Sequence, residues 1–263
     1  MNQDECSILI LGCDKYKNVL RISADFFSRN WADCPFPIYV GLEKEKIKFN
    51  NAVILNSEKK SWGARVIDYL NRIKTKFVMI ILDDFVIEQK VETDIVLEYL
   101  NLMGEDHNIA NIAFVDIFDK DNRPTSVPHL MKRKAKGDYL INMQIGIWDK
   151  DFLAGILDEN FTPWEAELYG SIRARKYSNK RTFLCLDDDN NMPIKYNRGW
   201  LIVQGKWNAN EIIRLNLYDY SSLFFDGKRI QYDDFEKVKL SFRIKRRFGI
   251  EFRKALSNVG IYI

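Results

Sequence analysis

Apolar runs alternate with helix-like segments along the first 150 residues of the chain. Residues 7–12 form an apolar run, and the apolar residues that follow recur every three or four positions up to Trp31, which predicts a strand and then a helix. The same reading predicts strands at 37–41, 52–55, 77–82, 110–115 and 139–148, and helices at 61–75 and 92–103. Residues 77–82 are apolar throughout, which is typical of a parallel strand covered on both faces. The pattern predicts an α/β fold, a three-layer α/β/α arrangement with a mostly parallel central sheet.

The pattern changes beyond residue 148. Helices are predicted at 149–157 and 163–176, and β-like runs at 181–186 and 192–196. Between those runs lie three Asp and two Asn residues, 187–191, which are typical of a hairpin turn and are also possible metal ligands. We favour the turn. No repeat or linker interrupts the chain, so we expect one domain over residues 1–217 and a basic C-terminal appendage over 218–263.

Composition and charge limit the function classes. A chain of 263 residues with 46% hydrophobic residues can bury a full core, and its four Cys and two His lack disulfide or zinc spacing. Residues 237–254 hold eight Lys/Arg and one Glu, a net +7, so the other residues carry −4. A mildly acidic body argues against nucleic-acid binding.

The basic tail, residues 237–254, mixes cationic with apolar side chains. This composition is typical of a segment that lies on an anionic membrane, and equally of a C-terminal helix that packs on the body. No apolar run reaches the ~20 residues that cross a bilayer, and the N-terminus lacks the positive charge of a secretory signal. We therefore expect a cytoplasmic protein, with a peripheral contact to the inner face of the membrane through the tail.

Candidate chemistry follows the predicted strands, because ligands of open α/β sheets bind beyond the carboxyl ends of the strands. The segment from Gly12 to Tyr16 contains neither a dinucleotide nor a P-loop motif. Its Asp14 could cap the next helix or, with Tyr16, hold a nucleotide base. Asp83 and Asp84 follow residues 77–82, and such a pair suits Mg²⁺ or Mn²⁺ bound to a diphosphate, the alternative being two surface residues.

Two helix starts carry further candidates. Ser61 is a predicted N-cap whose helix could offer N–H groups to phosphate, aided by Lys60 and Arg65, or could simply pack. Thr162, Pro163 and Glu165 fit a capping box, which gives Glu165 a structural role. Glu167 has no such role. Beside Trp164 and Tyr169 its carboxylate could act as a general base, the alternative being a solvated helix residue.

These segments resemble bacterial capsular-polysaccharide and cell-surface-glycan glycosyltransferases of GT-A type over roughly residues 7–207. The resemblance rests on the order of ILILGCDKYKN, FFSRNWADCPFPIYVG, SWGARVIDYLNRI, FVMIILDDF, GIWDKDFL, NFTPWEAELYGS and VQGKW. It implies a Rossmann-like GT-A fold that binds a nucleoside-diphosphate sugar over the sheet. The implied donor-binding residues are Cys13, Asp14, Tyr16, Trp62, Arg65, Asp83 and Lys206. Asp83 and Asp84 would bind the metal, although Phe85 stands where a D-x-D motif has its last Asp.

The resemblance also implies where the acceptor binds. Glu167, with Glu165 beside it, would supply the catalytic carboxylate, and Trp164 and Trp148 would contact the acceptor. We therefore expect transfer of a sugar from a UDP-sugar to a hydroxyl of a surface-polysaccharide precursor that a lipid can carry, with inversion if Glu167 is the base. The alternatives are a non-catalytic nucleotide-sugar-binding or scaffold protein and a sugar-1-phosphate nucleotidyltransferase. The last normally has a Gly-rich, basic first loop, which CDKYKN does not provide.

Overall fold

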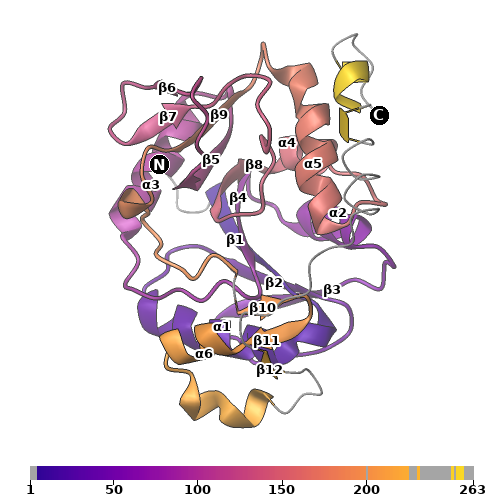
Figure 1. Cartoon of the computed structure of the whole chain (residues 1–263), viewed down its shortest axis with the longest axis vertical. Helices are drawn as coiled ribbons and strands as arrows, with labels where there is room; N and C mark the ends of the chain where they lie inside the picture. Colours follow the sequence, from indigo (N-terminus) through magenta and orange to yellow (C-terminus); the bar gives the residue numbers. More distant parts are fainter. Residues whose placement is uncertain (1–4, 200, 225–229, 232–249, 252, 258–263) are drawn as a thin grey trace.

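The computed structural model describes residues 5–199, 201–224, 230–231, 250–251 and 253–257 (Figure 1). Its main sheet has nine strands in the order β3-β2-β1-β4-β8-β5-β9-β7-β6. Their bounds are β1 (Cys6–Leu11), β2 (Ile38–Leu42), β3 (Ala52–Asn56), β4 (Phe77–Leu82), β5 (Ile109–Asp116), β6 (Arg123–Pro124), β7 (Leu130–Lys132), β8 (Gly146–Asp149) and β9 (Thr182–Leu186). Within this sheet only β7 and β8 run against the other strands, so the predicted mostly parallel sheet is confirmed.

Helices cover both faces of the sheet, which confirms the three-layer α/β class. One face packs against α1 (Lys17–Asn30) and α3 (Thr93–Glu105), and the other against α2 (Trp62–Arg72), α4 (Lys150–Ile156) and α5 (Pro163–Ala174). Successive residues of a strand point to opposite faces. Accordingly Ile8 lies in the core beneath α1, whereas Leu9 lies in the core beneath α2.

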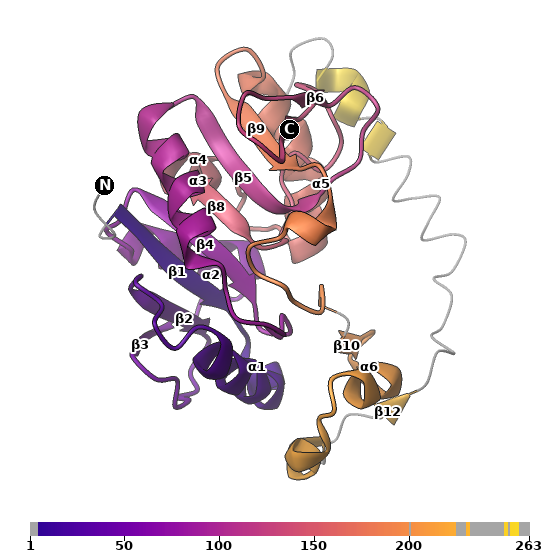
Figure 2. The same cartoon turned by 90° about the vertical axis from the view of Figure 1, so that its left-hand side faces the viewer.

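A small second sheet packs beside α1. It consists of β10 (Ile202–Val203), β11 (Lys206–Asn208) and β12 (Ile230–Gln231), with α6 (Ala209–Arg214) and the 3₁₀ turns η5 (Tyr218–Phe224) (Figure 2). Trp207, Leu217 and Phe224 share a buried cluster with Val19 and Ile22 of α1. The predicted domain boundary after residue 217 therefore falls within a single packed cluster.

Two predicted strands are shorter or missing, because side chains satisfy the backbone there. Only Gly146–Asp149 of the strand predicted at 139–148 forms β8. In the preceding segment the Arg133 guanidinium donates to the carbonyls of residues 138–140, and Ser171 Oγ accepts the Ile141 N–H at 3.0 Å. The run at 192–196 forms one bridge, Ile87 to Tyr196, and the acidic stretch before it is a turn, η4 (Asp189–Asn191), but not a hairpin.

The sheet topology determines which loops meet. Strands β1, β4, β5 and β9 are parallel, so the residues that follow them lie along one edge, called here the carboxyl edge. Because β8 runs the opposite way, the residues that precede it lie at this same edge. The carboxyl edge therefore gathers residues 12–16, 83–85, 117–119, 142–145 and 187–191.

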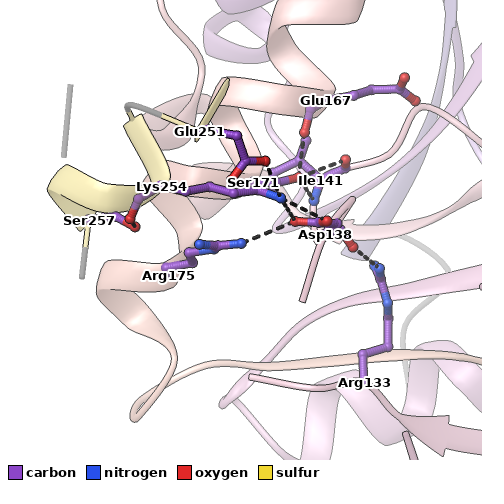
Figure 3. Close-up of polar contacts among 9 residues, drawn as sticks. All are labelled: Arg133, Asp138, Ile141, Glu167, Ser171, Arg175, Glu251, Lys254 and Ser257. Carbon is purple, nitrogen blue, oxygen red and sulfur yellow. Dashed lines mark hydrogen bonds and ion pairs between the residues drawn. The ribbon is translucent and has the colours of Figure 1, made fainter. Parts of the chain in front are cut away.

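The end of the basic tail returns to the body near α5 (Figure 3). Residues 250–251 and 253–257 are helical, Lys254 Nζ lies 2.9 Å from the Asp138 carboxylate, and the Arg253 guanidinium stacks 4.0 Å from the Tyr169 ring centroid. Residues 232–249, which include most of the predicted membrane-binding tail, lie outside the described residues. Among the described helices, none has the length and apolar content needed to cross a membrane.

Candidate active site

Asp83 and Asp84 stand at the end of β4, against the end of β1. The Asp83 N–H donates to the Leu11 carbonyl at 3.1 Å, which extends the β1–β4 pairing by one residue. Gly199, with φ +82°, lies beside Phe85 and Asp84. A Cβ at this glycine would lie 2.8 Å from the Phe85 ring and 3.4 Å from Asp84 Oδ2. The close approach and the positive φ explain a glycine here.

The two carboxylates are half-buried and electrostatically uncompensated. Burial raises the pKa of Asp83 well above its ordinary range, and the Asp84 charge raises it further, while a hydrogen bond from the Cys13 backbone opposes the shift. Burial also raises the pKa of Asp84 to about 7. Within the described residues neither carboxylate forms an ion pair with Lys or Arg. The pair therefore favours either a bound proton or a bound cation.

The donor set fits a divalent cation that is completed by a substrate. Two adjacent carboxylates supply the hard oxygen ligands that Mg²⁺ prefers. No third His, Cys, Asp or Glu joins them in the part of the chain that the structure describes. Mg²⁺ commonly binds through one or two carboxylates, water and substrate phosphates, so this small protein share suits a diphosphate complex.

Asp14 binds a neighbouring loop instead of capping a helix. Its carboxylate accepts the backbone N–H groups of Glu43 at 3.1 Å, Lys44 at 3.0 Å and Glu45 at 3.3 Å. In return Glu43 Oε2 accepts the Asp14 N–H at 2.6 Å. Asp14 thus joins the loops after β1 and β2. Beside it, burial raises the pKa of the Cys13 thiol to about 12, which keeps that side chain neutral.

Arg65 and the start of α2 are also occupied by protein contacts. The Arg65 guanidinium donates to the carbonyls of Lys59 and Lys60 and pairs with Glu43 at 3.1 Å. The N–H groups of Gly63 and Ala64 donate to carbonyls of residues 161 and 159. The hypothesis that these first amides bind phosphate is therefore wrong. Trp62 is half-buried against the core beneath α2, and a donor contact for it and Arg65 stays a prediction.

The loops after β1 and around β11 meet at the carboxyl edge. A Cβ at Gly205, whose φ is +76°, would lie 3.8 Å from the Tyr16 hydroxyl and 3.9 Å from Lys15 Nζ. Lys206 follows directly in β11 and is half-buried. The structure thus brings the segments of Tyr16 and Lys206, which are 190 positions apart in sequence, next to each other.

The two glutamates of α5 differ in their contacts. Glu165 Oε2 accepts the Thr162 N–H at 2.9 Å, and Thr162 Oγ1 accepts the Glu165 N–H at 3.3 Å, which confirms the capping box. Glu167 Oε1 instead accepts the N–H of Met143 at 2.9 Å, in the segment before β8. Glu167 is therefore directed to the carboxyl edge, whereas Glu165 serves its own helix. Trp164 is 66% exposed on the first turn of α5.

A series of contacts connects the Glu167 segment with Asp84. Tyr196 donates its hydroxyl hydrogen to Gln144 Oε1 at 2.9 Å and accepts the Ile145 N–H. Its ring packs on Phe85 with the centroids 4.8 Å apart. Sequence analysis missed Tyr196 and Gln144, since nothing in their local sequence marks them.

Trp148 does not contact an acceptor. It is fully buried in β8, where the register places it between Val78 and Asn111. Strand alternation directs its indole into the core beneath α2, α4 and α5. The prediction of an acceptor contact at this residue is therefore wrong.

Comparison with known proteins finds similarity to solved structures. No protein-family model and no curated protein sequence matches the chain. S. aureus TarS 1–349 in complex with UDP is 12% identical, with 70% of this chain and 58% of that chain covered and a TM-score of 0.48. A cytidylyltransferase from Leptospira borgpetersenii is 11% identical over 86% of this chain and 99% of that chain, with a TM-score of 0.42. An active-site mutant of LgtC is 10% identical over 86% of this chain and 72% of that chain, with a TM-score of 0.37.

The chain spans less than two thirds of the length of the TarS structures it matches. Two of the matched TarS structures are complexes with UDP and with UDP-GlcNAc, and another match is a CMP:2-keto-3-deoxy-manno-octonic acid synthetase. At identities of 10–14%, the similarity concerns the arrangement of the chain alone.

Proposed function

We propose that this chain is a glycosyltransferase that moves a sugar from a UDP-sugar to a hydroxyl of a surface-polysaccharide precursor. The observation that supports it most is the uncompensated pair Asp83 and Asp84 at the carboxyl end of β4. A diphosphate with a divalent cation would neutralise this pair and complete the coordination. A scaffold protein would not need a cation at this position.

The proposed donor site uses residues from three segments. Asp83 and Asp84 would hold Mg²⁺ or Mn²⁺, which supplies charge stabilisation to a leaving diphosphate. Lys206 adds a positive side chain from β11 and Tyr16 an aromatic ring from the loop after β1. Asp14 positions that loop through its three backbone contacts. The donor is thereby oriented along the carboxyl edge, with its nucleotide toward β1.

We assign proton removal from the acceptor hydroxyl to Glu167. A general base must lie at the reacting edge in a fixed orientation. The Met143 N–H binds Oε1 and so orients the carboxylate toward the segment before β8. A single displacement with Glu167 as the base inverts the anomeric carbon. Glu165, whose carboxylate completes the capping box, has no part in this step.

Product analysis tests the proposal against its rivals. The protein is incubated with UDP-sugars and Mn²⁺, with water or added glycosides as acceptor, and free UDP is measured. We expect UDP release that depends on the cation and is lost in Asp84→Asn. Pyrophosphate formed from UTP and a sugar 1-phosphate would identify a nucleotidyltransferase. Binding of UDP-sugars with no turnover under any of these conditions would identify a binding protein.

A further inference from the structure

A cavity lies between the segments that follow β5 and β7. It has a volume of about 220 Å³, and we call it the β5 pocket. Its lining includes Phe118, Asp119, Arg133, Lys134, Asp138 and Tyr139. The segment after β7 begins beside the N-terminal half of β9, where the Arg133 N–H donates to the Phe183 carbonyl at 2.9 Å. A ligand in the β5 pocket would therefore lie outside the reacting centre.

Two exposed aromatic rings flank the β5 pocket. Phe118 is 85% exposed and Tyr139 is 45% exposed. Tyr139 has φ +53°, a backbone conformation that L side chains rarely adopt. Arg133 Nη1 holds it there by donating to the Tyr139 carbonyl at 2.7 Å. The fold thus maintains an unfavourable backbone conformation at a residue whose ring contributes little to the core.

The basic side chains of the β5 pocket and Asp138 already have partners. Lys134 Nζ pairs with Asp121 at 2.6 Å, and the guanidinium of Arg133 donates to three backbone carbonyls. Asp138 pairs with Arg175 at 3.1 Å and with Lys254 at 2.9 Å (Figure 3). An anionic ligand would have to break these contacts, so the pocket favours a neutral one.

One polar acceptor faces the space between the two segments. Asp119 Oδ1 accepts the Asp121 N–H at 3.0 Å, while Oδ2 lies 4.0 Å from where a Cβ of Gly137 would be. A carboxylate oxygen in this position can accept from a ligand hydroxyl. An exposed aromatic face beside a hydroxyl acceptor matches a sugar ring, which has an apolar C–H face and hydroxyls at its rim.

We infer that the β5 pocket binds one neutral hexose ring of the acceptor glycan, stacked on Phe118 and Tyr139 with a hydroxyl on Asp119. The inference rests on the proposed function, since it assigns the pocket to a further unit of the acceptor glycan. The volume is below the ~300 Å³ at which pockets for drug-sized ligands begin, which suits a single ring. The wall at Asp138 is fixed by Arg175 and by Lys254 of the tail, so the site is preorganised.

Saturation-transfer NMR tests the inference without requiring catalysis. The full chain is mixed in turn with methyl glycosides of glucose, galactose and N-acetylglucosamine, and transfer to the ring protons is titrated. We expect at least one of them to bind, and Phe118→Ala and Tyr139→Ala each to weaken it about tenfold, which corresponds to ~1.4 kcal/mol. Tyr218→Ala is the matched control, since Tyr218 is 60% exposed on η5 and should leave binding unchanged.

Three results would overturn the inference: no saturation transfer to any methyl hexoside, the same transfer in Phe118→Ala as in wild type, or tighter binding of methyl glucuronide than of the neutral hexosides. The last result would show an anion site. UDP release from the donor in water is measured on the same variants and should stay at the wild-type rate. If donor turnover is absent while the hexoside binds at Phe118, the proposed function fails and the carbohydrate pocket stands.

Discussion

Two acidic runs lie at the carboxyl edge of the sheet, after β4 and after β9, and their carboxylates differ in their contacts. Asp83 and Asp84 follow β4, and Asp187, Asp188 and Asp189 follow β9. The first pair lacks ion-pair partners within the described residues, and burial raises the pKa of both carboxyl groups. In the second run each carboxylate has a partner. The amino-acid composition of the two runs is similar, so it is the hydrogen-bond and ion-pair partners of their carboxylates that distinguish them.

The contacts after β9 are those of a structural turn. Asp187 binds Asn191 at 2.8 Å and His129 at 3.3 Å, and Asp188 accepts the Asn190 N–H at 2.7 Å. Asp189 accepts the Asp116 N–H at 2.8 Å and pairs with Arg198. Burial favours a raised pKa for Asp187, but these hydrogen bonds outweigh it and the pKa is lowered. A carboxylate whose charge is balanced by hydrogen bonds and ion pairs within the fold has a structural role. A buried carboxylate without such partners is a candidate for binding a ligand.

The largest expected effect is on the rate of sugar transfer, which should depend on the first acidic run and not on the second. Asp84→Asn should reduce sugar transfer at least about a hundredfold, because it removes a charge that holds the cation at the leaving group. Asp188→Asn should leave transfer nearly unchanged, because an amide oxygen can still accept the Asn190 N–H. Initial rates of UDP release measure both. Equal losses in the two variants would contradict the distinction.

The same comparison applies to the two glutamates of α5. Glu167→Gln should slow transfer by ~10²- to 10⁴-fold, the usual contribution of a general base, while donor binding is retained. Its amide oxygen can still accept the Met143 N–H, so the fold should persist. Glu165→Gln keeps an acceptor for the capping box and should change the rate little. Single-turnover rates with prebound donor decide the assignment, and the reverse order of effects would exchange the two roles.

A cation should stabilise the protein only through the first run. At a cation concentration a hundred times its Kd, binding to the native state adds about 2.7 kcal/mol, a rise in Tm of roughly 5–10 °C. We expect this rise with Mn²⁺ for wild type and for Asp187→Asn, and none for Asp84→Asn. Differential scanning fluorimetry measures it. A full rise in Asp84→Asn would place the cation elsewhere.

The difference between the runs also explains what the sequence could predict. The apolar run of β4 and its acidic end are local, so both were predicted correctly, as was the capping box of Thr162 and Glu165. Whether an acid has a partner is not local. Asp14 binds residues about 30 positions away, and Glu167 binds one 24 positions away.

The incorrect predictions also concern contacts between residues that are far apart in sequence, or elements too short to form a pattern. The resemblance implies an acceptor contact for Trp148, but the register of β8 buries this residue. The strand predicted at 139–148 is shortened because Arg133 and Ser171 bind its first backbone groups. The second sheet was missed because β10, β11 and β12 are each two or three residues long, too short for a periodic pattern.

The smallest expected effect is the pH dependence of stability in the absence of a cation, and it should have opposite signs in the two runs. For Asp84 the folded pKa of about 7 exceeds the ordinary value of 3.8, so the folded state binds more protons between them. The free energy of unfolding then falls as pH rises from about 4 to 7. Asp84→Asn should therefore be more stable than wild type at about pH 8, by on the order of 1–3 kcal/mol, and the gain should shrink at about pH 5.

Asp187 should show the reverse, because its folded pKa is lowered. Its contribution to stability is present above the ordinary value of 3.8 and is lost as pH falls through the folded pKa. Asp187→Asn should thus be slightly less stable than wild type at about pH 8, and this difference should vanish in acid. Urea unfolding of the three proteins across this range measures both signs. A stabilising Asp187→Asn, or an Asp84→Asn without pH-dependent gain, would mean that the electrostatic contrast between the two runs is wrong.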